Sequence, residues 1–318
     1  MTRLADAIRA EIGDAELSEL TPMAGGRSGV TLAGRLTRDG VTREIVVKAK
    51  PPGRPATGRH DVLRQADALD LLATVPGVPS PRVLARVNGE EVCFVMERSR
   101  GSVTEPILDD DDRPPPDIVR ERALRSAGIL AALHRFDTAP LREPISDLAD
   151  EVGRWSGTAK SAGMAPGIDR LAESLAASVP AVDGPPVLVH GDFRLGNLVF
   201  DGAEPTGLID WEIWGLSRPG VDLGWFLVFC DASAFPGVGR PVDGLPSADE
   251  LVEAYRQAGG DVPDDLAWYE AFGRFKMAAI MAHNLHRHRA GRHVDPYQER
   301  LPPTIARLVE SGAEMLKR

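Results

Sequence analysis

Three oxygen-bearing polar side chains stand at fixed spacing near the middle of the chain, with short apolar runs between them. Asn197 lies five residues after Asp192, and Asp210 lies thirteen residues after Asn197. The apolar runs 198–200 and 206–209 flank an Asp-Gly pair, which is the residue pattern of a β-hairpin. This hairpin is expected to return Asp210 close to Asn197, so the sequence itself restricts how the segment can fold.

The residue types in this pattern suit the transfer of a phosphoryl group, which depends on positioning and charge neutralisation more than on covalent chemistry. Asp192, which follows a predicted buried strand at 187–189, would orient and deprotonate the accepting hydroxyl. Asn197 and Asp210 would offer a neutral and a charged oxygen to Mg²⁺, a hard cation that prefers oxygen ligands. Each residue alone is typical of a turn or a helix cap, and only the joint spacing supports this prediction.

The same residues carry a resemblance to a known family. The sequence His-Gly-Asp at 190–192, with Asn197 and the later Ile-Asp-Trp-Glu at 209–212, resembles the signature of the aminoglycoside phosphotransferase-like family. Glycine stands at the middle of the first motif, where protein kinases carry arginine, and this favours the branch that acts on small molecules. The resemblance implies that Asp192 is the catalytic base, that Asn197 and Asp210 bind Mg²⁺, and that ATP is the phosphoryl donor.

The resemblance extends over nearly the whole chain and implies a fold. It predicts a bilobal, protein-kinase-like α+β fold, with a small β-rich nucleotide-binding lobe over 1–100 and a larger, mainly helical catalytic and substrate-binding lobe over 101–318. His190 is expected to orient the loop through a hydrogen bond from a partly buried position. The resemblance also implies that Asp222 braces this loop, whereas Trp211 is most simply a core aromatic residue.

The first part of the chain carries candidates for binding the nucleotide. Gly25, Gly26 and Ser28 lie in a glycine-rich stretch between two predicted strands, where backbone N–H groups could approach phosphate oxygens. A hairpin turn also favours glycine, so this signal is weak on its own. Lys48 ends an apolar strand pattern and is expected to contact the ATP phosphates; the alternative is an edge-strand lysine whose stem lies along the surface.

Two further strands are predicted at 82–87 and 91–98, joined by an Asn-Gly turn. The second resembles the strand that enters the hinge between kinase lobes. This resemblance implies that backbone groups of Glu97, Arg98 and Ser99 meet the adenine edge of ATP.

The helix predicted over 60–74 departs from the family pattern. Gln65 stands where the family carries a glutamate that pairs with the phosphate-binding lysine, so it could accept a hydrogen bond from Lys48 but could not neutralise it. Asp61, one turn earlier, is the alternative partner. This departure motivates a second hypothesis, a non-catalytic nucleotide-binding pseudokinase. A third hypothesis is an enzyme that transfers AMP to a protein.

A long helix is predicted over 117–136, with His134 as a structural histidine near its end. The C-terminal third is predicted to form helices that build the acceptor pocket, over 220–231, 248–258, 265–289 and 299–316. Its cluster of His and Arg residues at 283–293 is interpreted as a solvated helix end, with an anion-binding wall as the alternative. Segments 269–289 and 50–53 resemble the branch of acyl-CoA-dehydrogenase-associated phosphotransferases.

Composition limits the classes of protein to which the chain can belong. Its 318 residues carry a formal net charge of -10, which disfavours a nucleic-acid-binding protein. No apolar run approaches the ~18 residues of a membrane span and the N-terminus lacks a signal-peptide core, so a cytoplasmic location without membrane contact is expected. Cys93 and Cys230 are expected to be small buried hydrophobic residues rather than a disulfide.

The function predicted from these observations is ATP- and Mg²⁺-dependent transfer of the γ-phosphoryl group to a hydroxyl of a small molecule. The acceptor stays open among aminoglycoside-like compounds, amino alcohols, sugars and hydroxyacyl-CoA thioesters, because one fold serves many acceptors. The acidic balance favours a cationic acceptor, whereas the 283–293 cluster favours an anionic one. Oligomeric state has no signature in the sequence.

Overall fold

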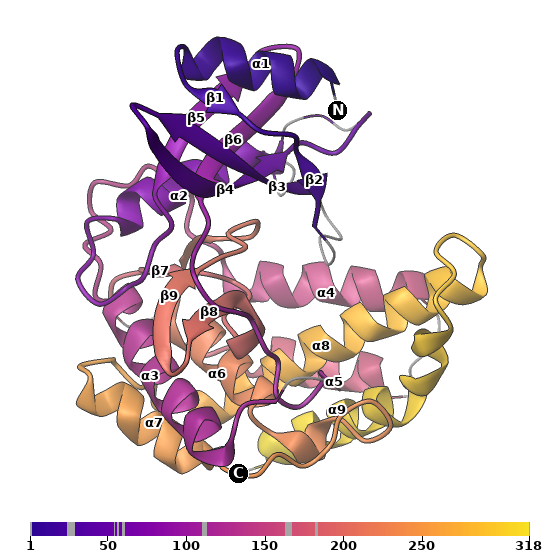
Figure 1. The fold of residues 1–318 in the computed structure, drawn as a ribbon. Coiled ribbons are helices and arrows are strands. Elements are labelled where there is room, and N and C mark those ends of the chain that lie inside the picture. The colour runs from indigo at the N-terminus through magenta and orange to yellow at the C-terminus, as the bar shows by residue number, and fades with distance from the viewer. Residues whose placement is uncertain are drawn as a thin grey trace. The chain divides into compact units, whose positions relative to one another are not determined.

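The structure is a computed structural model that describes residues 2–23, 29–53, 55, 57–58, 61–109, 113–162, 167–181 and 184–317. By its internal packing the chain divides into two compact units, whose elements are labelled in Figure 1. Unit 1 consists of Met1–Ser102 and Asn197–Trp214, and unit 2 consists of Val103–Gly196 and Gly215–Arg318. The functional division of the chain at residue 100 stays a prediction.

Within the described residues, unit 1 combines an antiparallel sheet, two helices and a separate hairpin. The sheet contains β1 (Glu16–Leu17), β2 (Thr21–Pro22), β3 (Val30–Arg38), β4 (Val41–Ala49), β5 (Val83–Asn88) and β6 (Val92–Glu97); the helices are α1 (Thr2–Ile12) and α2 (Val62–Leu72); and the hairpin contains β8 (Leu198–Asp201) and β9 (Glu204–Leu208). The sheet order is β1-β3-β4-β6-β5, with β2 paired to β3. The predicted helix over 60–74 and the strands over 82–87 and 91–98 are therefore confirmed.

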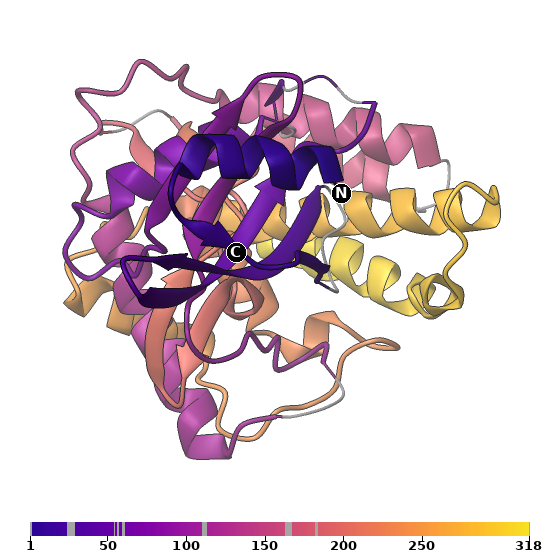
Figure 2. The same ribbon diagram turned by 45° about the horizontal axis from the view of Figure 1, so that its top comes forward.

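Alternation along β4 sends its side chains to opposite faces of the sheet. Ile45 and Val47 are fully buried and share a hydrophobic cluster with Ile8 of α1, the helix that lies across the sheet in Figure 2. Lys48 therefore points to the opposite face. Because β4 lies between β3 and β6, Lys48 is on an interior strand, and the edge-strand interpretation of this lysine is wrong.

The predicted β8–β9 hairpin is present, and its strands pair antiparallel. The N–H of Ile209 donates to the carbonyl oxygen of Asn197 at 2.9 Å, so Asp210 follows directly on a residue that is bonded to Asn197. The expected return of Asp210 to Asn197 is confirmed. Trp211 is buried in the core as predicted, and its indole N–H donates to a carbonyl oxygen of the hairpin.

Within the described residues, unit 2 is mainly helical. Its helices are α3 (Pro116–His134), α4 (Leu148–Ala162), α5 (Ile168–Ala177), α6 (Pro219–Phe229), α7 (Ala248–Gln257), α8 (Leu266–Arg289) and α9 (Pro302–Met315), with 3-10 turns η3 (Ala232–Ala234) and η4 (Pro296–Arg300) and a two-strand pair of β7 (Val187–Val189) and β10 (Gly215–Ser217). The turn η2 (Leu195–Asn197) crosses the boundary between the units along the chain. A sheet unit followed by a helical unit confirms the α+β class. Helices α4 and α5 were not predicted from the sequence; in α4, Gly153 and Gly157 weaken the helical signal.

Helix α8 is buried along most of its length, because it packs against α4, α6 and α9. Phe272 and Phe275 belong to the large cluster formed by these helices. Gly224 of α6 permits close packing, since a Cβ atom there would stand 2.5 Å from the backbone carbonyl oxygen of Tyr269. A helix surrounded in this way carries apolar residues on all its sides.

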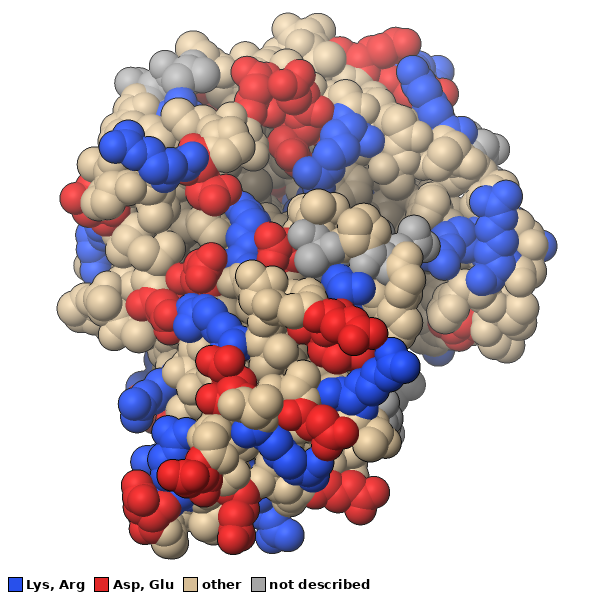
Figure 3. Space-filling model, turned by 90° about the horizontal axis from the view of Figure 1, so that it is seen from above, with Lys and Arg blue, Asp and Glu red and all other residues tan. Residues whose placement is uncertain are grey.

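Acidic and basic side chains are interspersed on the face drawn in Figure 3. Among the described residues, no helix is long and apolar enough to cross a membrane. Cys93 is buried and Cys230 is half-buried, and both are free thiols rather than a disulfide. Burial, with a contribution from the nearby Glu91, raises the pKa of the Cys93 thiol to about 12.

We expect Gly101→Ala to destabilise unit 1. Gly101 has a φ of 103°, and an added Cβ would overlap the carbonyl group of Phe200. The strained backbone and the overlap should together lower the free energy of unfolding by at least about 2 kcal/mol. Thermal and urea unfolding would measure the change. Gly89→Ala is the matched control, because no atom lies within 4 Å of its added Cβ. Equal stability of the two variants would contradict the prediction.

Candidate active site

One buried carboxylate fixes the backbone of the 190–197 loop in unit 2. The loop follows β7, and Asp222 lies in the first turn of α6. The two oxygens of this carboxylate accept the N–H of His190 at 2.6 Å and the N–H of Gly191 at 2.8 Å. Gly191 has a φ of 82°, which glycine adopts without strain, so the chain can turn there toward Asp192.

The charge of Asp222 is balanced inside the unit. Burial by itself would raise the pKa of Asp222, but the facing His134, together with His190, holds that pKa below its usual range. His134 Nε2 lies 3.6 Å from Asp222 Oδ2, and its Nδ1 lies 2.7 Å from the hydroxyl oxygen of Tyr255. His134 is thus buried between two polar partners, as a structural histidine requires.

His190 is fully buried, and not partly buried as the sequence suggested. The N–H of Asp192 donates to Nδ1 of His190 at 3.2 Å. The side chain therefore holds the backbone at Asp192 and has no exposed nitrogen in this position. The difference from the expectation arises because Phe193, also fully buried, covers the ring edge-on.

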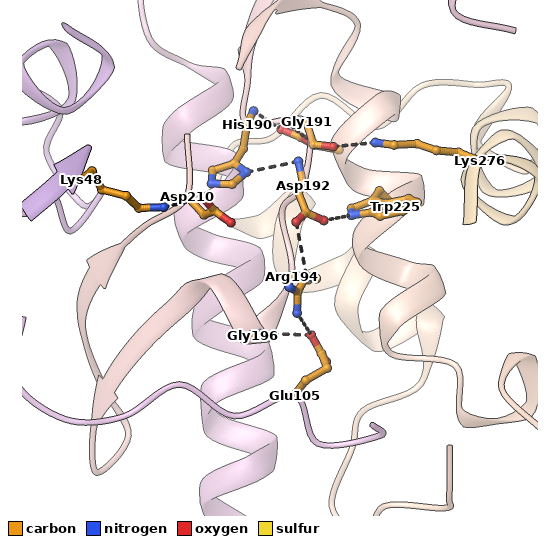
Figure 4. A network of polar contacts seen from close by, with 11 residues as sticks. Lys48, Glu105, His190, Gly191, Asp192, Arg194, Gly196, Asp210, Trp225 and Lys276 are labelled. Atoms are coloured by element: carbon orange, nitrogen blue, oxygen red, sulfur yellow. Dashed lines mark hydrogen bonds and ion pairs between the residues drawn. The ribbon is translucent and has the colours of Figure 1, made fainter. Parts of the chain in front are cut away.

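The Asp192 side chain is held by two donors from unit 2, which are drawn in Figure 4. The indole N–H of Trp225 donates to Oδ1 at 2.8 Å, and the Nε–H of Arg194 donates to Oδ2 at 3.4 Å. About a quarter of the side chain (26%) stays exposed. The carboxylate thus has a fixed orientation and an accessible part, which are the properties that a general base needs.

Lys276 of α8 supports the same loop from within the core. Its ammonium is buried, donates to the carbonyl oxygen of Gly191 at 2.6 Å, and lies 4.0 Å from the ring centroid of Trp225. Burial lowers the pKa of Lys276, and this effect outweighs the opposing attraction of Asp192 and Asp222. Lys276 was not predicted, although a lone lysine inside the apolar run 275–282 is a signal that could have identified it.

Glu105 is a second residue that sequence reasoning missed. Its side chain is buried, and Oε2 accepts the Nη1–H of Arg194 at 3.1 Å and the N–H of Gly196 at 3.0 Å. Burial raises the pKa of Glu105 to about 7, even though the guanidinium of Arg194 opposes the shift. The sequence around Glu105 has no feature that marks it as functional.

In unit 1, the ammonium of Lys48 lies between two carboxylates. It is 3.1 Å from Asp210 Oδ1 and 3.9 Å from Glu212 Oε1. Asp210 has a φ of 71°, a left-handed conformation that is rare for residues other than glycine and that often marks functional sites. Asn197, at the end of η2, is buried, and its carbonyl oxygen holds the segment that carries Asp210. The structure therefore brings Lys48, Asn197 and Asp210 together in one unit.

Two expectations for the partner of Lys48 are wrong. Asp61 is not that partner, because it is the N-cap of α2 and its side chain accepts the N–H of Arg64. Gln65 is buried, and Lys48 donates no hydrogen bond to it, both residues being among those that the structure describes. Glu212, which lies in the Ile-Asp-Trp-Glu motif, supplies the additional carboxylate in its place.

The expected nucleotide-binding residues of the hinge take part in the sheet. The N–H of Glu97 donates to the carbonyl oxygen of Arg82, which directly precedes β5. The N–H of Arg98 donates to the carbonyl oxygen of Glu44. These two N–H groups are therefore engaged in backbone hydrogen bonds. Three other expected residues lie outside the described residues, namely Gly25, Gly26 and Ser28.

Part of the cluster at 283–293 is paired with its own chain. Arg289 donates two hydrogen bonds to the Glu299 carboxylate, at 2.7 and 2.6 Å. His288 Nδ1 accepts the N–H of Asp295 at 2.9 Å. These contacts support a helix end stabilised by local pairing rather than an anion-binding wall.

The free energy of unfolding should depend on the ionisation of Glu105. The folded protein keeps the Glu105 proton up to about pH 7, whereas the unfolded chain releases it near 4.5. The folded state therefore binds more protons between these values, and stability is lost as the pH rises through this window. Relative to Glu105→Gln, the wild type should lose up to about 3 kcal/mol between pH 4.5 and 8. Urea unfolding of both proteins across this range would measure it, and a constant difference would contradict the prediction.

Solved structures share this fold. A structure of an aminoglycoside phosphotransferase-like protein from Ralstonia eutropha aligns with 100% of this chain and 98% of its own, with a TM-score of 0.80 and 22% identity. The GDP and kanamycin complex of APH(2'')-IIIa covers 99% of both chains, with a TM-score of 0.66 and 16% identity. At such identities the likeness concerns the fold alone, and it confirms the predicted bilobal protein-kinase-like architecture.

Curated relatives match in sequence, among them two proteins of Mus musculus. Acyl-CoA dehydrogenase family member 10 of Mus musculus is 29% identical over 262 residues, which cover 75% of this chain and 24% of that protein. Family member 11 of Mus musculus is 27% identical over 302 residues, which cover 87% of this chain and 38% of that protein. The chain thus spans well under half the length of these relatives. Their names agree with the expected resemblance to acyl-CoA-dehydrogenase-associated phosphotransferases.

A family profile matches the part of the chain that carries both groups of polar residues. Residues 19–272 match the family described as the phosphotransferase enzyme family (APH), and this range is most of the chain. It includes the 190–197 loop, its supporting residues Asp222 and Trp225, and the Lys48 and Asp210 pair in unit 1, whereas Lys276 lies just beyond it. The chain therefore belongs to the phosphotransferase enzyme family.

Proposed function

We propose that the protein transfers the γ-phosphoryl group of ATP to a hydroxyl of a small molecule in an Mg²⁺-dependent reaction. The observation that carries this proposal is the ion pair of Lys48 and Asp210 at 3.1 Å, with Asp210 in a left-handed backbone conformation. A lysine beside a strained aspartate suits a site that binds phosphates and a metal together. Membership of the phosphotransferase family supports the same reaction type.

In this proposal Asp192 is the catalytic base. Its carboxylate is oriented by Trp225 and Arg194 and remains partly exposed. A carboxylate in a fixed orientation can accept the proton of a hydroxyl that comes within hydrogen-bond distance. His190 and Asp222 support it by fixing the backbone of the loop.

The metal-binding role goes to Asn197 and Asp210. An amide oxygen and a carboxylate form a donor set that suits a hard divalent cation, and water and phosphate oxygens usually complete such a site. When bound, Mg²⁺ supplies charge neutralisation at the phosphate oxygens. Lys48 would release part of its contact with Asp210 and bind phosphate, while Glu212 stays within reach of the ammonium.

The remaining roles belong to the same proposal. We assign the contacts with the phosphates and the adenine to Gly25, Gly26, Ser28 and the hinge segment Glu97–Ser99. The acceptor is a small molecule with a hydroxyl group, and the reaction takes place in the cytoplasm. Solved family structures hold GDP with kanamycin, or AMP-PNP with hygromycin B, so an acceptor panel should begin with such compounds.

The alternative is a nucleotide-binding pseudokinase, which Gln65 suggested. With Gln65 in place of the family glutamate, Lys48 requires a carboxylate partner from elsewhere in the chain. Asp210 and Glu212 both lie within 4.0 Å of the Lys48 ammonium, so the missing charge has a local replacement. This pairing favours the catalytic proposal over the alternative.

We expect Asp192→Asn to lower Mg²⁺-dependent ADP release at least about 100-fold, because an amide cannot accept the proton. Affinity for ATP should stay within about twofold of the wild type, since the base does not bind the nucleotide. The assay would use aminoglycosides, amino alcohols, sugars and hydroxyacyl-CoA thioesters as acceptors. Mass spectrometry of the product would distinguish phosphoryl transfer from AMP transfer. Asp201→Asn, at an exposed residue near the tip of the β8–β9 hairpin, is the control. Wild-type turnover in Asp192→Asn would overturn the assignment of the base.

We expect Asp210→Asn to remove the dependence of ATP binding on Mg²⁺, because the metal loses its charged ligand. Calorimetric titration of ATP with and without Mg²⁺ would measure this effect as a ratio of the two affinities. Asp39→Asn is a matched control, since Asp39 also has a positive φ, of 52°, but lies in the β3–β4 turn. An unchanged affinity ratio in Asp210→Asn would contradict the metal assignment.

A further inference from the structure

The guanidinium of Arg194 connects two carboxylates of unit 2. Its Nε–H donates to Asp192 Oδ2 at 3.4 Å, and its Nη1–H donates to Glu105 Oε2 at 3.1 Å. Figure 4 shows the chain of contacts from Trp225 through Asp192 and Arg194 to Glu105. The proposed base is therefore linked, through a single arginine, to a buried acid that is 87 residues away in sequence.

The local structure is shaped around this arginine. Its Cζ lies 5.2 Å from the ring centroid of Phe229, which closes one side of the guanidinium. A Cβ atom at Gly196 would overlap Nη1 of Arg194, so the absence of a side chain there leaves room for the guanidinium. An arginine side chain has many rotamers, and an ordered position requires several such contacts.

Glu105 is itself anchored independently of its side chain. Its backbone N–H donates to Asp109 Oδ2 at 2.6 Å, and its carbonyl oxygen accepts the N–H groups of Leu108 and Asp109. Its Oε1 is buried and has no hydrogen-bond partner in the described part of the chain. A buried carboxylate with an unsatisfied oxygen is costly, and it is tolerated where the remaining oxygen makes charged contacts.

We propose that Glu105 is a positioning residue for phosphoryl transfer: it holds the Arg194 guanidinium, and the guanidinium in turn fixes the orientation of the Asp192 carboxylate. This inference rests on the proposed role of Asp192 as the base. It assigns to Glu105 an effect on turnover that passes entirely through Arg194. Glu105 contacts neither the nucleotide nor the acceptor in this account.

The spectroscopic test uses the bond between the Trp225 indole and Asp192. The indole ¹H–¹⁵N resonance of Trp225, identified by its loss in Trp225→Phe, reports on the position of Asp192 Oδ1, which lies 2.8 Å from Nε1. Spectra of wild type, Glu105→Gln, Arg194→Met and the double variant would be compared at pH 8, above the Glu105 pKa of about 7. Both single variants should shift this resonance in the same direction, and the double variant should match Arg194→Met.

The kinetic test uses MgATP alone at pH 8 and follows its hydrolysis to ADP and phosphate. Water is the acceptor in this reaction, so the test does not depend on an identified acceptor. Glu105→Gln should lower kcat about tenfold and leave KM for ATP within about twofold, since misplacement of a reacting group costs up to ~100-fold. Adding Glu105→Gln to Arg194→Met should cause no further loss, because the effect passes through the arginine. Glu253→Gln, which removes an exposed charge that pairs with Arg256, is the control for net charge.

The outcomes separate this inference from the proposed function. Multiplicative losses in the double variant, wild-type kcat in Glu105→Gln, or an unmoved Trp225 resonance would each overturn the positioning role. Thermal unfolding of each variant would show whether a loss reflects unfolding instead. Should Asp192→Asn keep wild-type turnover, the proposed base would fail, while the Trp225 resonance would still decide whether Glu105 orients Asp192.

Discussion

The 190–197 loop depends on the hydrogen bonds that its backbone makes to the buried carboxylate of Asp222. A carboxylate without solvent is costly unless hydrogen bonds and opposite charge compensate for the lost hydration. Here two backbone N–H groups at the start of the loop satisfy its oxygens, and His134 faces it from α3. Lys276 also holds the loop backbone, because its ammonium donates a hydrogen bond to the carbonyl oxygen of Gly191. Residues from three helices of unit 2 thus fix the backbone position from which the Asp192 side chain extends.

Charges of alternating sign surround Asp192 within unit 2. Lys276 lies on one side of the loop, and on the other Arg194 is followed by Glu105. Desolvation opposes the charge of both Lys276 and Glu105, as their shifted pKa values indicate. Each buried charge is therefore tolerated through an oppositely charged or strongly dipolar neighbour, and removing one member leaves another unpaired. Such a network orients a reactive group well because its members cannot move separately.

In unit 1 the charge that requires partners is the ammonium of Lys48. Lys48 needs carboxylate partners on the face of the sheet opposite α1, and Gln65 provides no charge there. The segment after β9 supplies two carboxylates, Asp210 and Glu212, from one short stretch of chain. Asp210 has a left-handed backbone conformation in this arrangement. The hydrogen bond from Ile209 to Asn197 holds the neighbouring backbone and so helps to maintain this strained conformation.

The sequence by itself determined the features that depend on neighbours along the chain. Alternating and helical patterns predicted most sheet strands, most helices and the β8–β9 hairpin. Helices α4 and α5 were missed, and in α4 two glycines weaken the helical pattern. The spacing of Asn197 and Asp210 around the hairpin predicted that these two residues lie close together, and the N–H of Ile209, bonded to Asn197, confirms it. The role of Asp192 at the same site stays a prediction. Tertiary structure alone decided the partners: Lys48 and Asp210 are 162 residues apart, and Arg194 and Glu105 are 89 apart. Such pairs follow from the packing of distant elements, and no local periodicity encodes which buried charges that packing brings together.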